Sequence, residues 1–162
     1  MLLFFEFDRL LRGHHIGERG PAARLARVLD EFPTVELVMI RWAIGPIRGM
    51  EDVQGELPEL GNRVRHLSHR SVRSEVFHER EITSTLRRLK QIYWAAVVHE
   101  RQAGGYLRTA QSSGAPLVLC RNGFDDEAAC RLRVALERVV SAEAFVSADH
   151  GFSNPKEFSC AS

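Results

Sequence analysis

The chain has 162 residues, of which 44% are hydrophobic and 27% are charged, and its formal net charge at pH 7 is +1. This is the composition of an ordinary globular domain, long enough to bury one sizeable core. The balanced charge gives no overall field that would direct the chain to nucleic acid or to a membrane, so such a partner has to be argued from a local patch.

The three cysteines, Cys120, Cys130 and Cys160, are an odd set without C-x-x-C spacing. They argue against a disulfide framework and a zinc site, and fit a reducing cytosol. The apolar start MLLFF reaches Glu6 too soon for a signal peptide, and no basic region precedes it. No run approaches the ~18 apolar residues that span a bilayer. We therefore expect a cytoplasmic protein with no membrane partner.

Four short apolar runs predict strands: LLFFEF (2–7), VELVMI (35–40), IYWAAVV (92–98) and PLVLC (116–120). Their hydrophobicity is nearly continuous, which is typical of strands buried on both faces of a parallel sheet.

Helical patterns lie between and after these runs. PAARLARVLDEF (21–32) begins with a proline suited to the first turn, and a second helix is expected within HEREITSTLRRLKQ (78–91). A third begins near Asp125 and Asp126 and runs to Val140. Residues 43–56 are interpreted as a long loop, and LPELGNRVRHL (57–67) as holding a short helix.

Alternating strands and helices predict an α/β fold, with right-handed crossovers that place the four strands in one parallel sheet. We expect one domain over residues 1–140 and a partly flexible C-terminal extension over 141–162, where the periodicity is weak.

Ligands of open parallel sheets bind at the carboxyl ends of the strands. The polar or aromatic residues that follow the four predicted strands are Glu6 and Asp8, Arg41 and Trp42, His99 and Glu100, and Arg121 and Asn122. This mixture could bind a phosphate or a metal. The alternative is that polar residues gather there because strand ends meet solvent.

Several phrases resemble the haloacid dehalogenase-like (HAD) superfamily, and in particular its small bacterial group described as the "HAD domain in Swiss Army Knife RNA repair proteins". The matching phrases are FFEFDRLL, ARVLDEFPTVELVMIRW, EREITSTLRRL, WAAVVHERQAGGYL and APLVLCRNGFDDEAACRLRVAL, which cover most of residues 2–138. DEFPTVELV and LVLCRNGFDDEAACRLR are the most specific. The resemblance implies a Rossmann-like, three-layer fold with a mainly parallel central sheet.

The resemblance also implies a phosphotransfer site that uses Mg²⁺. Glu6 stands at the position of the nucleophile that forms the phosphoenzyme, and Asp8 at that of the general acid/base. Arg41 lies near the position of the phosphate-binding hydroxyl, Arg80 matches the basic helix residue (with Arg87 or Lys90 as substitutes), and His99 and Glu100 match the metal-binding acids. The implied metal ligands are therefore Glu6, Asp8, His99 and Glu100.

Four of these positions depart from the family pattern. Glu6 has one more methylene than Asp, which displaces its carboxylate by roughly 1 Å, a misplacement to which in-line attack is sensitive. No hydroxyl stands at Ile40 or Arg41, Arg9 replaces a turn glycine, and the nitrogen donor of His99 suits Mg²⁺ poorly. The sequence therefore predicts an eroded phosphotransfer site. Two alternatives remain: a Mn²⁺ or Zn²⁺ site on the same four residues, or neutralisation of the acids by Arg9, Arg41 and Arg121.

Other features are weaker. NRVRHLSHRSVR (62–73) is a basic patch that could touch phosphates, although a solvated or internally paired face is the favoured reading. His66 and His69 have metal-ligand spacing if helical. His14-His15 falls in a loop, Gly104-Gly105 in a turn, and Cys120 in the core.

The functional hypothesis is a catalytically impaired HAD-like protein that acts as a binding or accessory protein for a protein partner or a phosphorylated ligand. The alternatives are a divergent metal-dependent phosphohydrolase, acting for instance on nucleic-acid ends, and an RNA-associated protein that uses residues 62–73.

Overall fold

The computed structural model describes residues 1–11, 20–42, 49–70 and 75–149. Its strands are β1 (Leu2–Glu6), β2 (Glu36–Trp42), β3 (Val64–Arg70), β4 (Trp94–His99) and β5 (Leu117–Cys120). Its helices are α1 (Phe7–Leu10), α2 (Pro21–Asp30), α3 (Met50–Glu56), α4 (Pro58–Gly61), α5 (Glu75–Arg88), α6 (Gly104–Ser113) and α7 (Asp126–Asp149), with a 3₁₀ turn, η1 (Glu100–Gln102).

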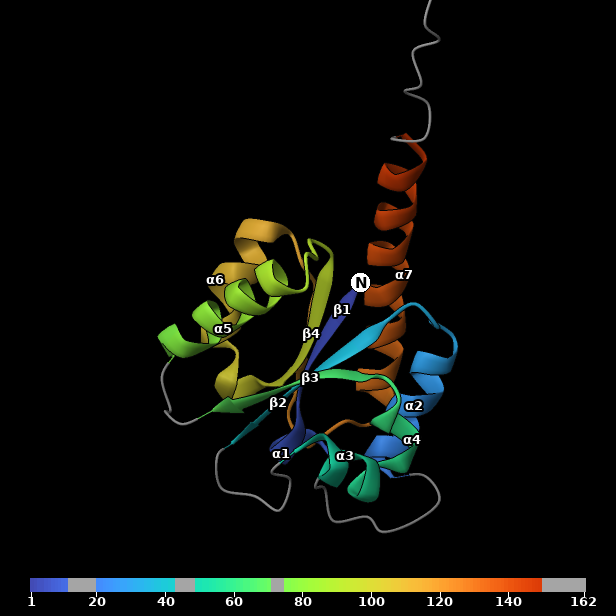
Figure 1. Ribbon diagram of the computed structural model, residues 1–162, viewed down its shortest axis with the longest axis vertical. Coiled ribbons are helices and arrows are strands. Elements are labelled where there is room, and N and C mark those ends of the chain that lie inside the picture. Colours follow the sequence, from blue (N-terminus) through green and yellow to red (C-terminus); the bar gives the residue numbers. More distant parts are fainter. Residues whose placement is uncertain (12–19, 43–48, 71–74, 150–162) are drawn as a thin grey trace, which may run out of the picture.

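The strands form one five-stranded sheet in the order β3-β2-β1-β4-β5, and every neighbouring pair is parallel. Helices cover both faces of the sheet (Figure 1). The predicted α/β, Rossmann-like fold is confirmed, because each of the four predicted strands and the three predicted helices has its counterpart. Within the described ranges, no helix is both long enough and apolar enough to cross a membrane.

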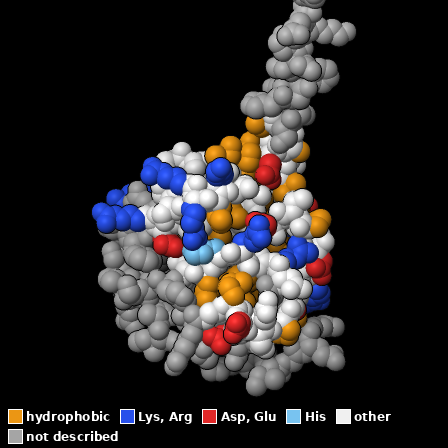
Figure 2. Space-filling view, viewed as in Figure 1, with side chains coloured by type: hydrophobic (Ala, Val, Ile, Leu, Met, Phe, Trp, Pro, Cys, Tyr) orange, Lys and Arg blue, Asp and Glu red, His pale blue; other side chains and the backbone are white. Residues whose placement is uncertain are grey.

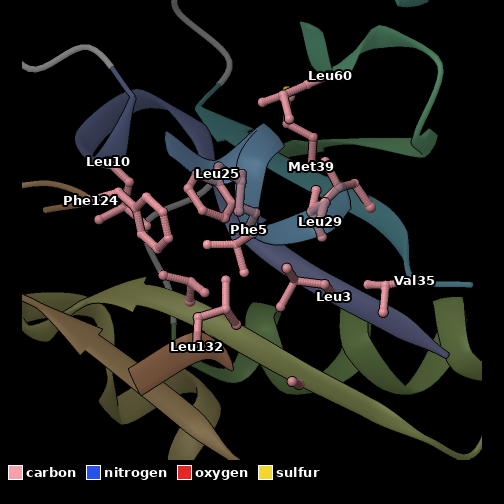
Figure 3. Close-up of a cluster of buried hydrophobic side chains, with 14 of the residues drawn as sticks. Leu3, Phe5, Leu10, Leu25, Leu29, Val35, Met39, Leu60, Phe124 and Leu132 are labelled. Carbon is pink, nitrogen blue, oxygen red and sulfur yellow. The ribbon is translucent and has the colours of Figure 1, made fainter. Parts of the chain in front are cut away.

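The larger core lies between the sheet and the helices α2 and α7. Leu3 and Phe5 of β1 point into it, and Leu29 of α2 and Leu132 of α7 close over them (Figure 3). The ring of Phe5 meets that of Phe124 edge to face, with centroids 5.7 Å apart. Since this core is continuous from β2 across to β5, it fixes the carboxyl ends of the strands relative to one another.

A smaller core lies on the opposite face, under α5 and α6. The alternate residues of β1, Leu2 and Phe4, point into it, as expected for a strand with period two. Phe4 contacts Trp94 of β4 edge to face at 5.6 Å. This alternation continues to Glu6, which therefore belongs to the α5 and α6 face of the sheet.

Strand β3 was missed by the sequence prediction, which expected a short helix here. The helix is present but ends at Gly61, and the chain continues as an edge strand from Val64. The β2–β3 register passes from Leu37↔Val64 to Val38↔His66, which leaves Arg65 as an extra residue in a bulge. Val64 and Leu67 consequently share one core although they are three residues apart, a helical spacing.

Two further helices replace predicted loops. Residues 50–56 form α3, whose first turn is capped by a hydrogen bond of 2.9 Å from the Gly49 N–H to Asp52 Oδ2. Gly104-Gly105, predicted as a turn, begins helix α6 instead. The two glycines lower the helix propensity of this segment, but Gly105 and Tyr106 are buried in the fold, so tertiary packing decides the conformation.

Helix α7 begins as predicted and ends later. Asp125 caps it through a 2.8 Å hydrogen bond from the Ala128 N–H to Oδ1. The predicted end at Val140 is wrong, because the helix continues to Asp149. Alanines in SAEAFVSAD (141–149) favour the helix although they give no amphipathic pattern. Residues 150–162 lie outside the described ranges.

Candidate functional site

The order of the strands reverses between β1 and β4, and this is the position at which open α/β sheets bind ligands. Glu6 is the last residue of β1 and is only 2% exposed. Its Oε2 accepts a hydrogen bond of 3.0 Å from the backbone N–H of His99, the last residue of β4. The sequence prediction that Glu6 and His99 meet at one edge of the sheet agrees with this arrangement.

The residues after β4 turn away from Glu6 into the 3₁₀ turn η1. His99 caps this turn, since its Nδ1 accepts a hydrogen bond of 3.2 Å from the Arg101 N–H. Glu100 Oε2 lies 2.8 Å from Arg121 Nε, and both side chains are partly or largely exposed. Arg121 therefore pairs with an acid, but in a surface ion pair between the ends of β4 and β5 and not in the buried pair that the neutralisation alternative implied.

A hollow of about 380 Å³ lies beside this ion pair, at the outer carboxyl edge of the sheet. Arg121, Asn122 and Arg131 line it together with three acids. The three acids outnumber the two arginines, and both arginines have partners within the protein: Arg131 lies 3.9 Å from Glu127, and its Nη2 donates to the Leu119 carbonyl at 2.7 Å. The hollow thus has no net positive charge to attract an anion.

The remaining predicted site residues lie on α1, β2 and α5. Asp8 lies in α1, two residues beyond the end of β1, and Arg41 lies near the end of β2, but the side chains of both fall outside the described part of the structure, as does that of Arg9. Arg80 is exposed near the start of α5.

The suggested substitutes for Arg80 lie far from this edge. Helix α5 returns from the carboxyl end of β3 to the amino end of β4, so Arg87 and Lys90 are near the amino ends of the strands. The helix ends at Arg88, roughly 12 Å along the axis from Arg80 at 1.5 Å per residue, and Lys90 follows that end. Neither can contact a ligand at the carboxyl edge.

The described donors do not fit Mg²⁺. Glu6 and Glu100 each direct an oxygen to a partner in the protein, and His99 offers nitrogen, whereas Mg²⁺ requires octahedral oxygen ligands. Among the side chains that the structure describes, no three histidines, cysteines or acids are placed to hold a metal ion. The predicted set of Glu6, Asp8, His99 and Glu100 includes Asp8, which lies outside that comparison.

A second polar cluster was missed by the sequence analysis. Ser68 of β3 and Thr85 of α5 are almost fully buried, and with Glu6 they are the buried polar side chains of the described residues. Glu81 of α5 lies between them, with Oε1 3.5 Å from the Thr85 hydroxyl and 3.7 Å from Nε2 of His66. The His66 imidazole, with smaller contributions from Ser68 and Arg88, holds the pKa of the Glu81 carboxyl below its ordinary value of 4.5 against the opposing effect of burial.

Glu6 and Ser68, the buried polar residues of the two sites, share one row of the sheet. Glu6 is aligned with Ile40, and Ile40 with Ser68, so Ser68 stands two strands from Glu6 at the same level and on the same face. The alternation of polar His66 and Ser68 with apolar Leu67 indicates a strand and could have revealed this arrangement in the sequence. The bulge at Arg65 interrupts the period-two pattern just before it, so the strand was not recognised.

The two arginines of the basic segment whose side chains are described, Arg63 and Arg65, are paired within the protein, and residues 71–73 lie outside the described ranges. Arg63 Nη2 lies 3.3 Å from Asp30 and its Nη1 donates to the Phe32 carbonyl, while Arg65 Nε lies 3.0 Å from Glu36. These contacts agree with the internally paired alternative. Residues 66 and 69 lie on strand β3 and not on a helix, so the helical spacing on which the metal pair depended is absent.

Cys120, at the end of β5, is buried in the larger core as expected. Burial raises the pKa of its thiol to about 12, and the nearby Asp125 adds to this effect. A thiol that stays protonated is a poor nucleophile, so Cys120 is structural. His14-His15 and Cys160 lie outside the described residues.

Comparisons with protein-family profiles, with curated proteins and with solved structures gave no match. The functional interpretation therefore depends on the fold and on the contacts described above.

Proposed function

We propose that the protein is a Rossmann-like domain with an eroded phosphotransfer site of the HAD type, and that it acts by binding rather than by catalysis. The observation that carries this proposal is the hydrogen bond between the buried Glu6 carboxylate and the His99 N–H. It gives the residue at the nucleophile position a structural role between two central strands.

The chemistry of attack supports this reading. A carboxylate nucleophile must approach the phosphorus in line, within about 3–3.5 Å, with a lone pair free for the new bond. Glu6 is almost completely buried, and the extra methylene relative to Asp moves its oxygens away from where an aspartate would hold them. The hydrogen bond from His99 further lowers the nucleophilicity of the oxygen that accepts it.

The charged residues around the site also support the proposal that it does not catalyse phosphotransfer. In a working phosphotransferase of this type, acids after β4 hold the metal that offsets the charge of the phosphate. Here Glu100 lies 2.8 Å from Arg121, and the adjoining hollow is lined by three acids against two arginines. Electrostatic stabilisation of a transferring phosphoryl group would therefore be weak.

We assign the binding function to the same edge of the sheet, where Arg41 lies near the end of β2 and the exposed Arg80 lies in the first half of α5. A phosphorylated ligand or a protein partner would be recognised there by charge-assisted hydrogen bonds. We expect Arg41→Ala or Arg80→Ala to weaken that binding.

Hydrolysis of p-nitrophenyl phosphate with Mg²⁺ or Mn²⁺ tests the proposal. The expected result is a rate no higher than that of Asp8→Ala, because this variant lacks the acid/base that any catalysis of this type would need. Steady turnover that Asp8→Ala abolishes would contradict the proposal and support the divergent phosphohydrolase. Glu6→Asp serves as the matched control, since it supplies the family nucleophile while leaving the other three departures in place.

A further inference from the structure

The amino ends of the strands, opposite the candidate site, carry an apolar hollow of about 370 Å³. We call it the amino-end groove and define it by Ile92, Tyr93, Trp94, Pro116, Val139 and Ala142. Ile92 is 75% exposed, so the groove opens to solvent. Its volume is at the lower end of the range found for binding pockets, which suits one large side chain with its neighbours.

Helix α7 leaves the body of the protein next to this groove. Its last residues, 141–149, form what we call the α7 projection, which rises past the amino ends of the strands (Figure 1). Phe145 on it is 74% exposed and Val146 is 40% exposed. Hydrophobic side chains gather where the projecting helix meets the body, with basic side chains beside them (Figure 2).

The exposed apolar surface is concentrated in this region. Among the described residues, five large hydrophobic side chains are exposed, and Ile92, Phe145 and Val146 are three of them. Clusters of this kind mark interaction surfaces rather than ordinary scattered exposure. Phe145 lies one turn beyond Ala142, and its exposure shows that it does not fill the groove of its own chain.

We propose that a second copy of this chain fills the groove, with the α7 projection of each copy inserting Phe145 into the amino-end groove of the other. A groove and a projecting apolar residue on adjacent turns of one helix make the surface self-complementary. One twofold axis then satisfies both grooves at once and closes the assembly as a dimer.

The geometry of α7 allows this exchange. Arg138, Ala142 and Phe145 are spaced by four and three residues, so they share one face of the helix. Phe145 lies roughly 10 Å along the axis from Arg138. Two antiparallel α7 helices that cross near the small Ala142 would therefore bring each Phe145 to the partner's groove.

The charges at this surface are also complementary. Arg138 lines the groove and Lys90 lies two residues before Ile92, and no ion pair of either residue is found within the described part of the chain. Residues 141–149 contain two acids and no basic residue, and the last turn of α7 has no basic residue to offset the helix dipole. Glu143 is partly neutralised by the Met1 ammonium at 3.4 Å.

Antiparallel packing places the negative end of each α7 near Arg138, the basic residue that lines the groove of the other copy. The same basic and apolar surface could meet an anionic membrane. A concave groove beside a projecting helix, however, fits a protein side chain better than a flat lipid surface.

Sedimentation of the full chain over a range of concentrations tests the proposal. We expect a monomer–dimer equilibrium whose dissociation constant rises at least about tenfold in Phe145→Ser, as for an interface anchor. Val134→Ser is the matched control, because Val134 is also exposed on α7 at 45% but lies outside the groove, and it should leave the equilibrium unchanged. A wild-type chain that stays monomeric up to about 100 µM, a concentration at which even a weak dimer would be populated, overturns the proposal.

Photo-crosslinking identifies the occupant directly. Benzoylphenylalanine in place of Phe145 should link to residues 92–94 or 113–116, and a mixture of ¹⁴N and ¹⁵N chains should give mixed-isotope crosslinks. Crosslinks found only within one isotope would show that the chain's own segment occupies the groove, and crosslinks only to added phosphatidylserine vesicles would show a membrane surface. Either result overturns the proposal.

Discussion

The carboxylate of Glu6, at the end of β1, accepts a hydrogen bond from the backbone N–H of His99, at the end of β4, across 3.0 Å. These two strands are neighbours at the point where the strand order reverses, where ligands enter related folds. In this chain a buried acid joins the two strand ends. Glu6, which the resemblance to HAD proteins puts at the nucleophile position, therefore contributes to the fold.

Removing this carboxylate should destabilise the protein. Glu6→Ala leaves the part-buried His99 N–H without its acceptor, and we expect a loss of about 1–3 kcal/mol in the free energy of unfolding. Glu6→Gln keeps an acceptor oxygen and should lose less. Urea denaturation measures both. An alanine variant as stable as the wild type would mean that the hydrogen bond does not contribute to the stability of the fold.

The polar cluster of His66, Ser68, Glu81 and Thr85 predicts that the stability of the fold depends on pH. Because His66 lowers the pKa of Glu81 in the folded state, the ionised carboxylate stabilises the fold fully above its ordinary pKa of 4.5, and the contribution disappears as the pH falls through the lower folded value. We expect Glu81→Gln to be less stable than the wild type by up to about 1 kcal/mol at pH 7. The difference should shrink toward pH 2. A constant difference across this range would contradict the assignment.

The larger core predicts a sharp contrast between two phenylalanines. Phe124 is 1% exposed and packs on Phe5, so Phe124→Ala should cost about 3–5 kcal/mol. Phe145→Ala, at a residue that is 74% exposed, should change the stability of the monomer by less than about 0.5 kcal/mol. Thermal unfolding at low protein concentration, where copies are separate, checks both values. Equal losses would show that the end of α7 packs differently.

Much of the fold could be predicted because continuous apolar runs such as LLFFEF and PLVLC have few alternatives to buried parallel strands. Strand β3 could not be, since the bulge at Arg65 gives Val64 and Leu67 a helical spacing. Helix α6 was hidden by its two initial glycines. In both cases tertiary packing overrides the local pattern.

The candidate site, like the fold, could be predicted from the sequence only in part. Strand ends in a parallel sheet meet at one edge, so Glu6 and His99 could be brought together from the sequence. Their contact is made through the backbone N–H of His99, and no pattern of side chains in the sequence predicts such a contact. The Ser68 and Glu81 cluster joins an edge strand to a helix, and it becomes visible only once β3 is recognised.

The central claim is that the acids at the strand ends serve the protein's own structure and do not present a metal site. A calorimetric titration of the purified protein with Mg²⁺ and with Mn²⁺ tests it most directly, with Glu6→Ala and Asp8→Ala as controls. The account predicts no specific binding of either ion to the wild type. Saturable binding that both substitutions abolish would contradict it and would show that the strand still presents a working metal site.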